Sequence, residues 1–373
     1  MPMASNVDRL TYGGRAAATF ETGRWELTPG LDAQNSRHRR RNAMGIDAYL
    51  NLPRVQDADL RQRGAFVEAA YAASASSRWI GGLRVDRSSA TDHRRAVPGM
   101  PPQPTSGETR DEILESGFLR HEWLRGEGFS AFAGVGQVRR MPDYWELFSP
   151  NMGPMGSPNA FDGLRPERTT QLDAGLNYRS QRLDAWINAY AGRIDDYILF
   201  TYGSGGMMGA STRADNVDAA IRGAEAGVEY RALDALKLGA TLARAWGENR
   251  DAGTPLPQMP PLELRTTAAW DAGDWSFGLL WRLVDAQDRV AVGQGNVVGQ
   301  DLGASKGFGT LAINGAVRLG QYLRLSAGID NLFDRAYAEH LNLAGSADFG
   351  YPAERVRILE PGRSAWLKLD FSY

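Results

Sequence analysis

Two kinds of connection between strand-like segments alternate along this chain, and their alternation is the strongest constraint on its fold. The short connections contain glycine or small polar residues, which supply the backbone angles of tight hairpin turns. They are predicted at 21–24, 125–128, 179–182, 272–274 and 320–321. The long connections are polar and are predicted at 36–61, 88–109, 141–166, 202–215, 248–262, 285–307 and 333–362. Short reversals at one end of a meander and long loops at the other are typical of an outer-membrane β-barrel.

The segments between these connections alternate apolar and polar residues with a period of two, which gives a β-strand two different faces. In the segment 171–179, Leu172, Leu176 and Tyr178 fall on the apolar face. The segments 322–330 and 364–373 alternate in the same way. In a soluble sandwich the apolar face would meet a core, whereas in a membrane barrel it would meet lipid and the polar face would line an aqueous lumen. The pattern alone leaves both possibilities open.

Aromatic residues favour the membrane alternative, because many of them lie within about two residues of a predicted short turn. These residues are Trp25, Trp79, Trp123, Tyr178, Tyr230, Trp270, Trp275 and Tyr322. A belt of amphipathic rings at a membrane interface would have this distribution. The alternative is that aromatic residues simply flank hairpins, as they do in other β-proteins. Because all eight rings lie at one end of the meander, we favour the belt.

Composition excludes several classes of protein. The chain has 373 residues, no cysteine and a formal net charge of −2. The lack of cysteine excludes disulfides, thiolate metal sites and cysteine nucleophiles, and the small net charge provides no basic field for nucleic acid. No apolar run approaches the roughly 20 residues of a membrane helix, and no signal peptide opens the sequence. Together with 43 glycines, these features predict an all-β protein.

We expect about fifteen strands in an antiparallel arrangement. They are predicted at 11–21, 24–34, 62–73, 78–87, 110–124, 128–140, 167–179, 182–200, 216–230, 236–247, 263–271, 275–284, 308–319, 322–331 and 363–373. Bacterial single-chain barrels have even strand counts and both termini on the periplasmic side. The odd count places the first residue outside and, with the missing signal peptide, predicts that this chain is the C-terminal part of a longer protein.

Four segments resemble motifs of the TonB-dependent outer-membrane receptors. Met141–Phe148 resembles their Arg-x-Pro…Glu-Leu-Phe segment, and Leu164–Thr170 resembles their Leu-x-Pro-Glu strand start. Asp330–Tyr337 is similar to their Asn-Leu-Phe-Asp-x-x-Tyr segment, and Glu360–Tyr373 is similar to their C-terminal strand. The resemblance implies a 22-stranded barrel, an N-terminal plug and energy from an inner-membrane TonB complex. Residues 1–373 would then form one incomplete barrel domain, the last fifteen strands of a transmembrane antiparallel β-barrel whose N-terminal plug is missing.

Within that family the chain most resembles the TonB-dependent copper receptors. The stretches that carry this resemblance are 151–157, 256–263, 295–303 and 337–340. It implies a receptor in the Gram-negative outer membrane that takes up copper, with lipid and lipopolysaccharide around it and the TonB complex bound through the missing N-terminal region. Copper would be a transported ligand rather than a resident cofactor. The alternatives are a receptor for a siderophore or another metal chelate, and a passive porin.

Candidate metal ligands are few. Met152 and Met155 are three residues apart in a loop rich in glycine and proline, and a pair of soft thioethers suits Cu(I). The alternative is that these methionines fill gaps in loop packing. Met207 and Met208 allow the same two interpretations. The histidines, His38, His93, His121 and His340, lack the spacing of a zinc site.

Charged clusters also allow two interpretations. The run Arg37–Arg41 could bind lipopolysaccharide phosphates or an anionic ligand, because arginine matches phosphate geometry, or it could be a solvated loop. Asp195 with Asp196, and Asp330 with Asp334, could bind Ca²⁺ or could be strand-end carboxylates. No nucleophile motif or phosphate-binding loop is found in a fitting context. We therefore expect no catalytic residues and no enzymatic activity.

Overall fold

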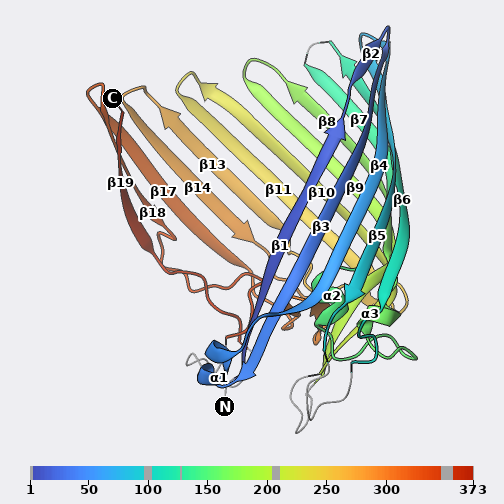
Figure 1. Ribbon diagram of the computed structural model, residues 1–373. Coiled ribbons are helices and arrows are strands. Elements are labelled where there is room, and N and C mark those ends of the chain that lie inside the picture. Colours follow the sequence, from blue (N-terminus) through green and yellow to red (C-terminus); the bar gives the residue numbers. More distant parts are fainter. Residues whose placement is uncertain (1–2, 96–102, 127, 204–210, 346–355, 373) are drawn as a thin grey trace. The chain divides into compact units, whose positions relative to one another are not determined.

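The computed structural model describes residues 3–95, 103–126, 128–203, 211–345 and 356–372. In this described part, nineteen strands form one sheet and three short helices lie in connections between strands (Figure 1). Fifteen of the described strands have eight residues or more, which is the number predicted from the sequence. The expected all-β antiparallel fold is therefore confirmed. No helix among the described residues is long and apolar enough to cross a membrane.

The long strands carry most of the structure. They are β1 (Met3–Ala17), β3 (Trp25–Met44), β4 (Val55–Ser74), β5 (Ser77–Asp92), β6 (Thr109–Arg125), β7 (Phe129–Arg140), β8 (Glu167–Arg179), β9 (Leu183–Gly203), β10 (Ser211–Leu233), β11 (Leu236–Asn249), β13 (Glu263–Asp271), β14 (Trp275–Val284), β17 (Phe308–Leu319), β18 (Leu323–Asp330) and β19 (Ser364–Phe371). The short elements are β2 (Phe20–Thr22), β12 (Thr254–Pro255), β15 (Gln294–Asn296), β16 (Gly299–Gln300), α1 (Ile46–Asn51), α2 (Tyr144–Phe148) and α3 (Ala160–Gly163).

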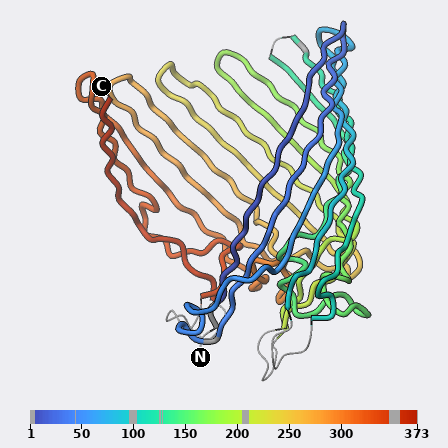
Figure 2. The backbone as a smooth tube through the Cα atoms, viewed as in Figure 1, coloured from blue at the N-terminus to red at the C-terminus, as the bar shows by residue number. Residues whose placement is uncertain are grey.

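The chain divides into two compact units, which we describe separately. Unit 1 comprises Met1–His121, Gly134–Thr170 and Ile194–Asp218, and unit 2 comprises Glu122–Ala133, Gln171–Arg193 and Ala219–Tyr373. In unit 1, β1, β3, β4 and β5 pair in that order. In unit 2, β11, β13, β14, β17, β18 and β19 pair in that order, and every one of these pairs is antiparallel (Figure 2).

The predicted short turns are present, and glycines with positive φ make several of them possible. Gly23, Gly273 and Gly320 have φ of 61°, 84° and 70°. Gly128, with φ of 80°, is also in close contact with the next hairpin. A Cβ atom at Gly128 would lie 1.7 Å from the carbonyl oxygen of Arg179. Only glycine fits there, because both the backbone angle and the lack of space exclude a side chain.

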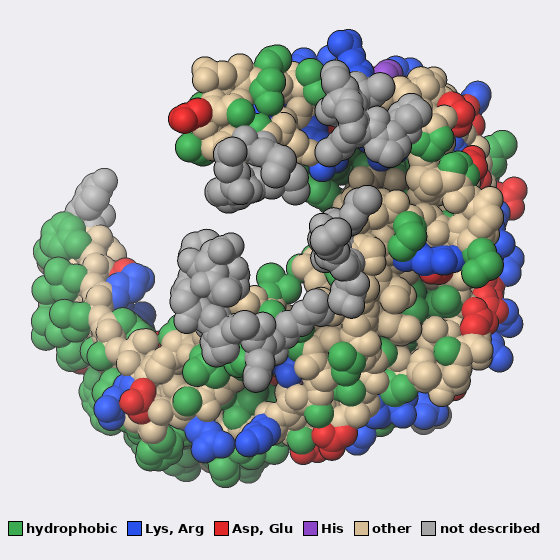
Figure 3. Space-filling model, turned by 90° about the horizontal axis from the view of Figure 1, so that it is seen from below, with side chains coloured by type: hydrophobic (Ala, Val, Ile, Leu, Met, Phe, Trp, Pro, Cys, Tyr) green, Lys and Arg blue, Asp and Glu red, His purple; other side chains and the backbone are tan. Residues whose placement is uncertain are grey.

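Register places apolar side chains of neighbouring strands on the same face. Between β18 and β19, Leu325 is opposite Leu369 and Ala327 is opposite Leu367, whereas Arg324 is opposite Asp370 on the other face. Leu367 is 73% exposed, so this apolar face is not buried in a protein core. Hydrophobic side chains gather over the C-terminal strands at the left of Figure 3. An apolar face left open in this way is what contact with lipid requires.

Most of the predicted aromatic rings are exposed beside the short turns. Seven of the eight are at least 39% exposed, namely Trp25, Trp79, Trp123, Tyr178, Tyr230, Trp275 and Tyr322. The eighth, Trp270, stacks on Trp275 with ring centroids 6.2 Å apart. Trp25 packs against Tyr71 at 4.6 Å across β3 and β4. These positions suit rings that lie at the boundary between lipid and water.

The long loops predicted at 141–166 and 285–307 match the ends of the flanking strands. Three others, at 36–61, 88–109 and 202–215, are shorter than expected, and those boundaries were wrong. The first was placed at 36–61, but β3 continues to Met44 and β4 begins at Val55. The run Arg37–Arg41 therefore lies in a strand and not in a loop. Likewise β9 continues to Gly203 and β10 begins at Ser211, inside the connection predicted at 202–215. The periodicity fades in these segments because both faces are polar, yet pairing with neighbouring strands keeps the backbone extended.

The turn between β6 and β7 provides a test of this geometry. We expect Gly128→Ala to lower the free energy of unfolding by about 2 kcal/mol or more, because it forces a left-handed backbone on alanine and a contact with Arg179. Gly126→Ala is the matched control, since no atom lies within 4 Å of the position that a Cβ atom would take there. Urea unfolding of the protein in detergent, followed by tryptophan fluorescence, measures the difference. Equal stability of the two variants would contradict the tight approach.

Candidate functional site

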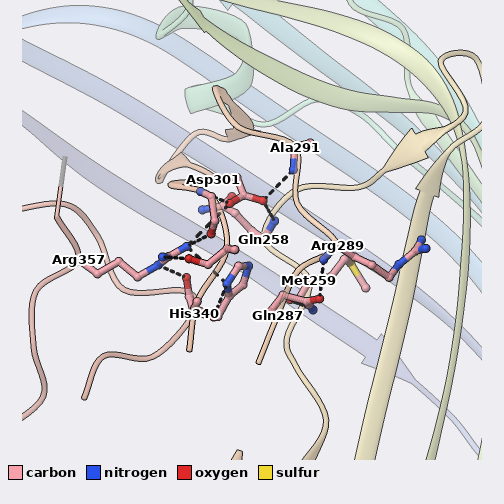
Figure 4. Close-up of polar contacts among 11 residues, drawn as sticks. Gln258, Met259, Gln287, Arg289, Ala291, Asp301, His340 and Arg357 are labelled. Carbon is pink, nitrogen blue, oxygen red and sulfur yellow. Dashed lines mark hydrogen bonds and ion pairs between the residues drawn. The ribbon is translucent and has the colours of Figure 1, made fainter. Parts of the chain in front are cut away.

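A buried polar network links the three long connections of unit 2 (Figure 4). The connections are 250–262 after β11, 285–307 between β14 and β17, and the described parts of 331–363 between β18 and β19. Charged or polar residues of these connections, Gln287, Asp301 and His340, are each no more than 8% exposed. Buried polar groups have to find partners within the protein, so their contacts determine how the three connections are held.

Asp301 is the acceptor at the centre of the network. Its carboxylate accepts hydrogen bonds from the backbone N–H groups of Ala291 at 3.0 Å and Gly303 at 2.9 Å. A longer contact of 3.4 Å comes from the backbone N–H of Gln258, which belongs to the connection after β11. Arg357 lies 3.9 Å away and supplies the opposite charge. A buried carboxylate with several donors and a cation is stable without water.

Arg357 ties the last connection to the middle one. Its guanidinium donates to the carbonyl oxygens of His340, at 3.0 Å, and Ala304, at 3.1 Å, and also to that of Gly303. Arginine can satisfy several carbonyls at once because its donors form a rigid planar fork. The side chain is only 11% exposed, and burial lowers the pKa of Arg357 from its ordinary value.

His340 is held in the same network through one ring nitrogen. Its Nδ1 lies 3.0 Å from the hydroxyl of Ser305. Its Nε2 is buried without a hydrogen-bond partner among the described residues. Burial lowers the pKa of His340, and the positive charge of Arg357 lowers it further, while Asp301 opposes the change. The imidazole is therefore neutral at physiological pH.

Gln287 and Arg282 add two further links between the connections. Gln287 exchanges backbone hydrogen bonds of 3.0 Å with Ser305, and its side chain donates to the carbonyl of Met259 at 2.9 Å. Arg282, on β14, pairs with Glu263 at 2.6 Å and also with Glu339 of the last connection. The network therefore extends from the loops to the strand ends beneath them.

This convergence was not predicted, although a signal for it was present. Three of the four stretches that carry the resemblance to copper receptors, 256–263, 295–303 and 337–340, supply Gln258, Asp301 and His340 to the same network. The fourth, 151–157, belongs to unit 1. Sequence alone could not show that stretches up to about eighty residues apart meet, because no local pattern records a long-range contact.

In unit 1, the motif Met141–Phe148 contains α2, and its side chains take part in a second cluster of polar residues. Asp143 caps the helix, and its side chain and that of Glu146 form a capping box. The hydroxyl of Tyr144 donates to Asp57 at 2.6 Å, and its ring stacks on His38 at 4.0 Å. Burial raises the pKa of Tyr144, so this phenol remains protonated. A cavity of about 540 Å³ beside α2 is lined by these two rings and by polar residues.

The second family motif completes this cluster. Glu167, from the Leu-x-Pro-Glu strand start, is only 7% exposed and accepts hydrogen bonds from Arg140, at 2.5 Å, and from the backbone N–H of Ile198, at 2.7 Å. Arg140 also forms two hydrogen bonds with Glu146, at 2.7 and 2.8 Å. The two motifs are therefore joined through one guanidinium group, which explains why they have these residue types.

The structure leaves the two candidate methionine ligands exposed. Met152 is 45% exposed and Met155 is 88% exposed, in the segment between α2 and α3. Met152 is fixed by backbone hydrogen bonds, since its N–H donates to the carbonyl of Thr212 at 3.0 Å. Met207 and Met208 lie outside the described residues. No group of three or more His, Cys, Asp or Glu suited to a metal ion occurs in the part of the chain that the structure describes.

The other candidates have ordinary structural partners. His93 lies 3.4 Å from Asp59, and His121 lies 2.7 Å from the hydroxyl of Ser77. Asp195 and Asp196 pair with Arg168 and Arg165, which agrees with the strand-end interpretation. Arg37 lies 3.6 Å from Asp59, and Arg41 stacks over the ring of Tyr49 at 4.2 Å.

Comparisons with known proteins now identify the family. Residues 3–332 match the family described as TonB dependent receptor-like, beta-barrel. The chain belongs to this family. It is a family of receptors and not of enzymes, and the resemblance seen in the sequence is confirmed.

Similar solved structures agree with this result. The copper transporter OprC is 48% identical, covers 100% of this chain and 58% of its own, and has a TM-score of 0.95. The ferric yersiniabactin uptake receptor FyuA of Yersinia pestis is 15% identical, covers 100% of this chain and 55% of its own, and has a TM-score of 0.68, which shows the fold alone. The ferric enterobactin receptor of Pseudomonas aeruginosa is 24% identical over 266 residues, 65% of this chain and 36% of that protein. The chain thus spans little more than half of the OprC chain and about a third of the ferric enterobactin receptor.

The central carboxylate can be tested by removing its charge. We expect Asp301→Asn to favour local opening of the three connections by about 3–5 kcal/mol, because it leaves Arg357 buried without its counter-charge. Hydrogen exchange of the backbone amides of Ala291 and Gly303 measures this opening. Asp288→Asn, at an exposed position of the same connection, is the control and should leave exchange unchanged. Similar exchange in both variants would show that Asp301 does not hold the network.

The lowered pKa of His340 predicts a dependence on pH. Where the network is open, the ring binds a proton below its ordinary pKa of about 6.5, whereas the closed network keeps it neutral. The closed form is therefore fully stable above pH 6.5 and loses stability as the pH falls below that value. Hydrogen exchange in 286–305, corrected for intrinsic rates, should accelerate in acid. His340→Gln should remove the acceleration, and the control His93→Gln should retain it.

Proposed function

We propose that this chain is the barrel part of an outer-membrane active-transport receptor that takes up copper with energy from the TonB complex. The observation that carries the proposal is the match to the copper transporter OprC, at 48% identity over the whole chain. Identity at that level over the whole chain extends beyond a shared fold. Copper enters this proposal as transported cargo, and no resident cofactor is needed.

The polar network of unit 2 supports a receptor role, because a receptor needs ordered loops at the point where ligand arrives. The Asp301, Arg357 and His340 contacts link three connections at the same ends of their strands. Ordered loops lower the entropy lost when a ligand binds. In this proposal the network is a scaffold for capture. It is not itself the ligand site, since its carboxylate and guanidinium already have partners within the three connections.

The partners of the proposed receptor follow from its location. In the Gram-negative outer membrane, the exposed apolar face would contact lipid and lipopolysaccharide, and the TonB complex would act through an N-terminal region of the full receptor. The net charge of −2 argues against nucleic acid as a partner.

A second candidate is a receptor for a ferric siderophore or another metal chelate. The match to the ferric enterobactin receptor favours it, at 24% identity over 266 residues. The two candidates differ in the metal that enters the cell. Accumulation of copper and of iron in cells that express the full receptor, each measured under limitation of that metal, distinguishes them. Copper accumulation that does not depend on the receptor would refute the first proposal.

Met152 and Met155 are proposed as contacts for copper on its way into the receptor. Their exposed thioethers suit a soft cation, and Met155 is 88% exposed. We expect the double variant Met152→Leu, Met155→Leu to reduce copper accumulation about 10-fold at limiting metal, because leucine keeps the volume but removes the sulfur. Met259→Leu is the matched control, since Met259 is partly buried. Unchanged accumulation in the double variant would leave these methionines as loop packing only.

A further inference from the structure

Three arginines form a row on the face of β4 and β5 that also carries exposed apolar side chains. Arg63 on β4 is directly opposite Arg87 on β5, and Arg61 lies two residues before Arg63 on β4, opposite Ser89. Residues directly opposite each other share a face, and so do residues two apart on one strand. The three guanidinium groups therefore leave the sheet on the same side. We call Arg61, Arg63 and Arg87 the arginine row.

The row is poorly neutralised by the protein. Two like charges directly opposite each other on neighbouring strands destabilise a sheet. Arg63 donates only to neutral acceptors, the carbonyls of Gln34 and Gln62 and the side chain of Asn35.

The remaining two arginines of the row are no better compensated. Arg87 lies 3.3 Å from Asp111 with 73% of its own side chain exposed, and an exposed pair of this kind contributes little. Arg61 has no ion pair among the described residues. On this face of β3 to β6, alternation places two further carboxylates, Glu115 of β6 and Asp59 of β4. Asp59 already pairs with Arg37. The row therefore keeps an excess of positive charge.

A continuous apolar surface begins next to the row, on the side of the short turn between β4 and β5. Ala65 and Val85 are opposite each other next to Arg63 and Arg87, followed by Val67 opposite Leu83. Val85 is 50% exposed and Leu83 is 69% exposed. An exposed apolar surface bordered by cations fits an amphiphile. Its acyl chains would lie on Val67, Leu83 and Val85, and its anionic groups would contact the arginines.

The distance to the aromatic end supports this arrangement. Tyr71 is opposite Trp79 at the short-turn end of the same two strands, eight residues from the Arg63 and Arg87 pair. At 3.3–3.4 Å per residue the two levels are about 27 Å apart along the strand. Barrel strands are usually tilted by 35–45°, so the two levels are separated by roughly 20 Å along the membrane normal. The arginine side chains are long and bring their guanidinium groups closer to the edge of an apolar band that is about 25 Å tall. If the rings mark one interface, the row lies at the other.

We propose that the arginine row binds the phosphate groups of lipopolysaccharide, that is, the lipid A phosphates of the outer leaflet. The proposal rests on the outer-membrane location proposed above. Guanidinium groups match phosphate oxygens in pairs, and adjacent arginines on two strands suit a lipid that carries two phosphates. The basic run Arg37–Arg41 fits this role less well, because Arg37 is paired with Asp59 and Arg41 is engaged with Tyr49 and the carbonyl of Leu52.

The test measures binding of defined lipids to the purified full-length receptor in detergent by native mass spectrometry. Bisphosphorylated lipid A, monophosphoryl lipid A and phosphatidylglycerol are the three probes. We expect Arg63→Gln with Arg87→Gln to bind bisphosphorylated lipid A at least 10-fold more weakly than the unaltered protein, because the double change removes two charge-assisted contacts. Arg63→Lys with Arg87→Lys keeps the charge but not the planar fork, so its affinity should be intermediate.

The matched control is Arg24→Gln with Arg78→Gln, which removes the same charge at the short-turn end. It should bind lipid A as the unaltered protein does. Heat-modifiable gel mobility reports whether each variant is folded. Equal binding by the Arg63 and Arg87 variant, or an equal loss in the control, would overturn the proposal. Phosphatidylglycerol binding as tight as that of lipid A would also overturn it, since the site would then belong to a different lipid.

Failure of this proposal is distinguishable from failure of the proposed transport. The proposed route of copper does not involve the arginine row, so the Arg63 and Arg87 variant should accumulate copper normally once folded. A receptor that binds lipid A through the row but does not accumulate copper would refute the proposed cargo and leave the lipid site intact.

Discussion

Backbone hydrogen bonding between neighbouring antiparallel strands is the constraint on which the rest of this structure depends. In hydrocarbon, each unsatisfied N–H or C=O group costs several kcal/mol, so only helices and paired strands can cross a membrane. Pairing in the ladder satisfies these groups without help from side chains. The side chains are then free to follow the solvent, and this is why Leu172 and Leu367, at 61% and 73% exposure, can lie outside any core.

Beyond the strands, the same requirement is met by side chains. The connections of unit 2 have few ladder hydrogen bonds, and buried Asp301, Arg357 and Gln287 satisfy the backbone there instead. In unit 1, Glu167 does the same for the backbone N–H of Ile198. The loops are therefore ordered by buried charges whose partners are carbonyl and N–H groups of the same loop and of neighbouring loops. A receptor gains from such order, because its capture surface is formed before the ligand arrives.

Much of the fold could be predicted because its pattern is local. Alternation in 171–179 and 364–373 identified strands, and glycines such as Gly23 and Gly320 identified turns. The extension of β3 to Met44 could not be predicted, because Ser36–Met44 has polar residues on both faces and its extended backbone depends on β1 and β4. The network around Asp301 escaped prediction for a related reason. Its partners, Ala291, Gln258 and Arg357, are far apart in the sequence and have no common motif.

The pairing of β3 on both sides has a consequence for digestion of the protein from outside. Proteases bind their substrates as an extended chain and attack exposed loop tips most readily. The segment Arg37–Arg40 is hydrogen bonded to β1 along one edge and to β4 along the other. This segment is the most arginine-rich of the sequence, but it offers trypsin no unpaired backbone edge to bind. Cleavage in this region should instead begin in the connection at 45–54, where the ladder stops.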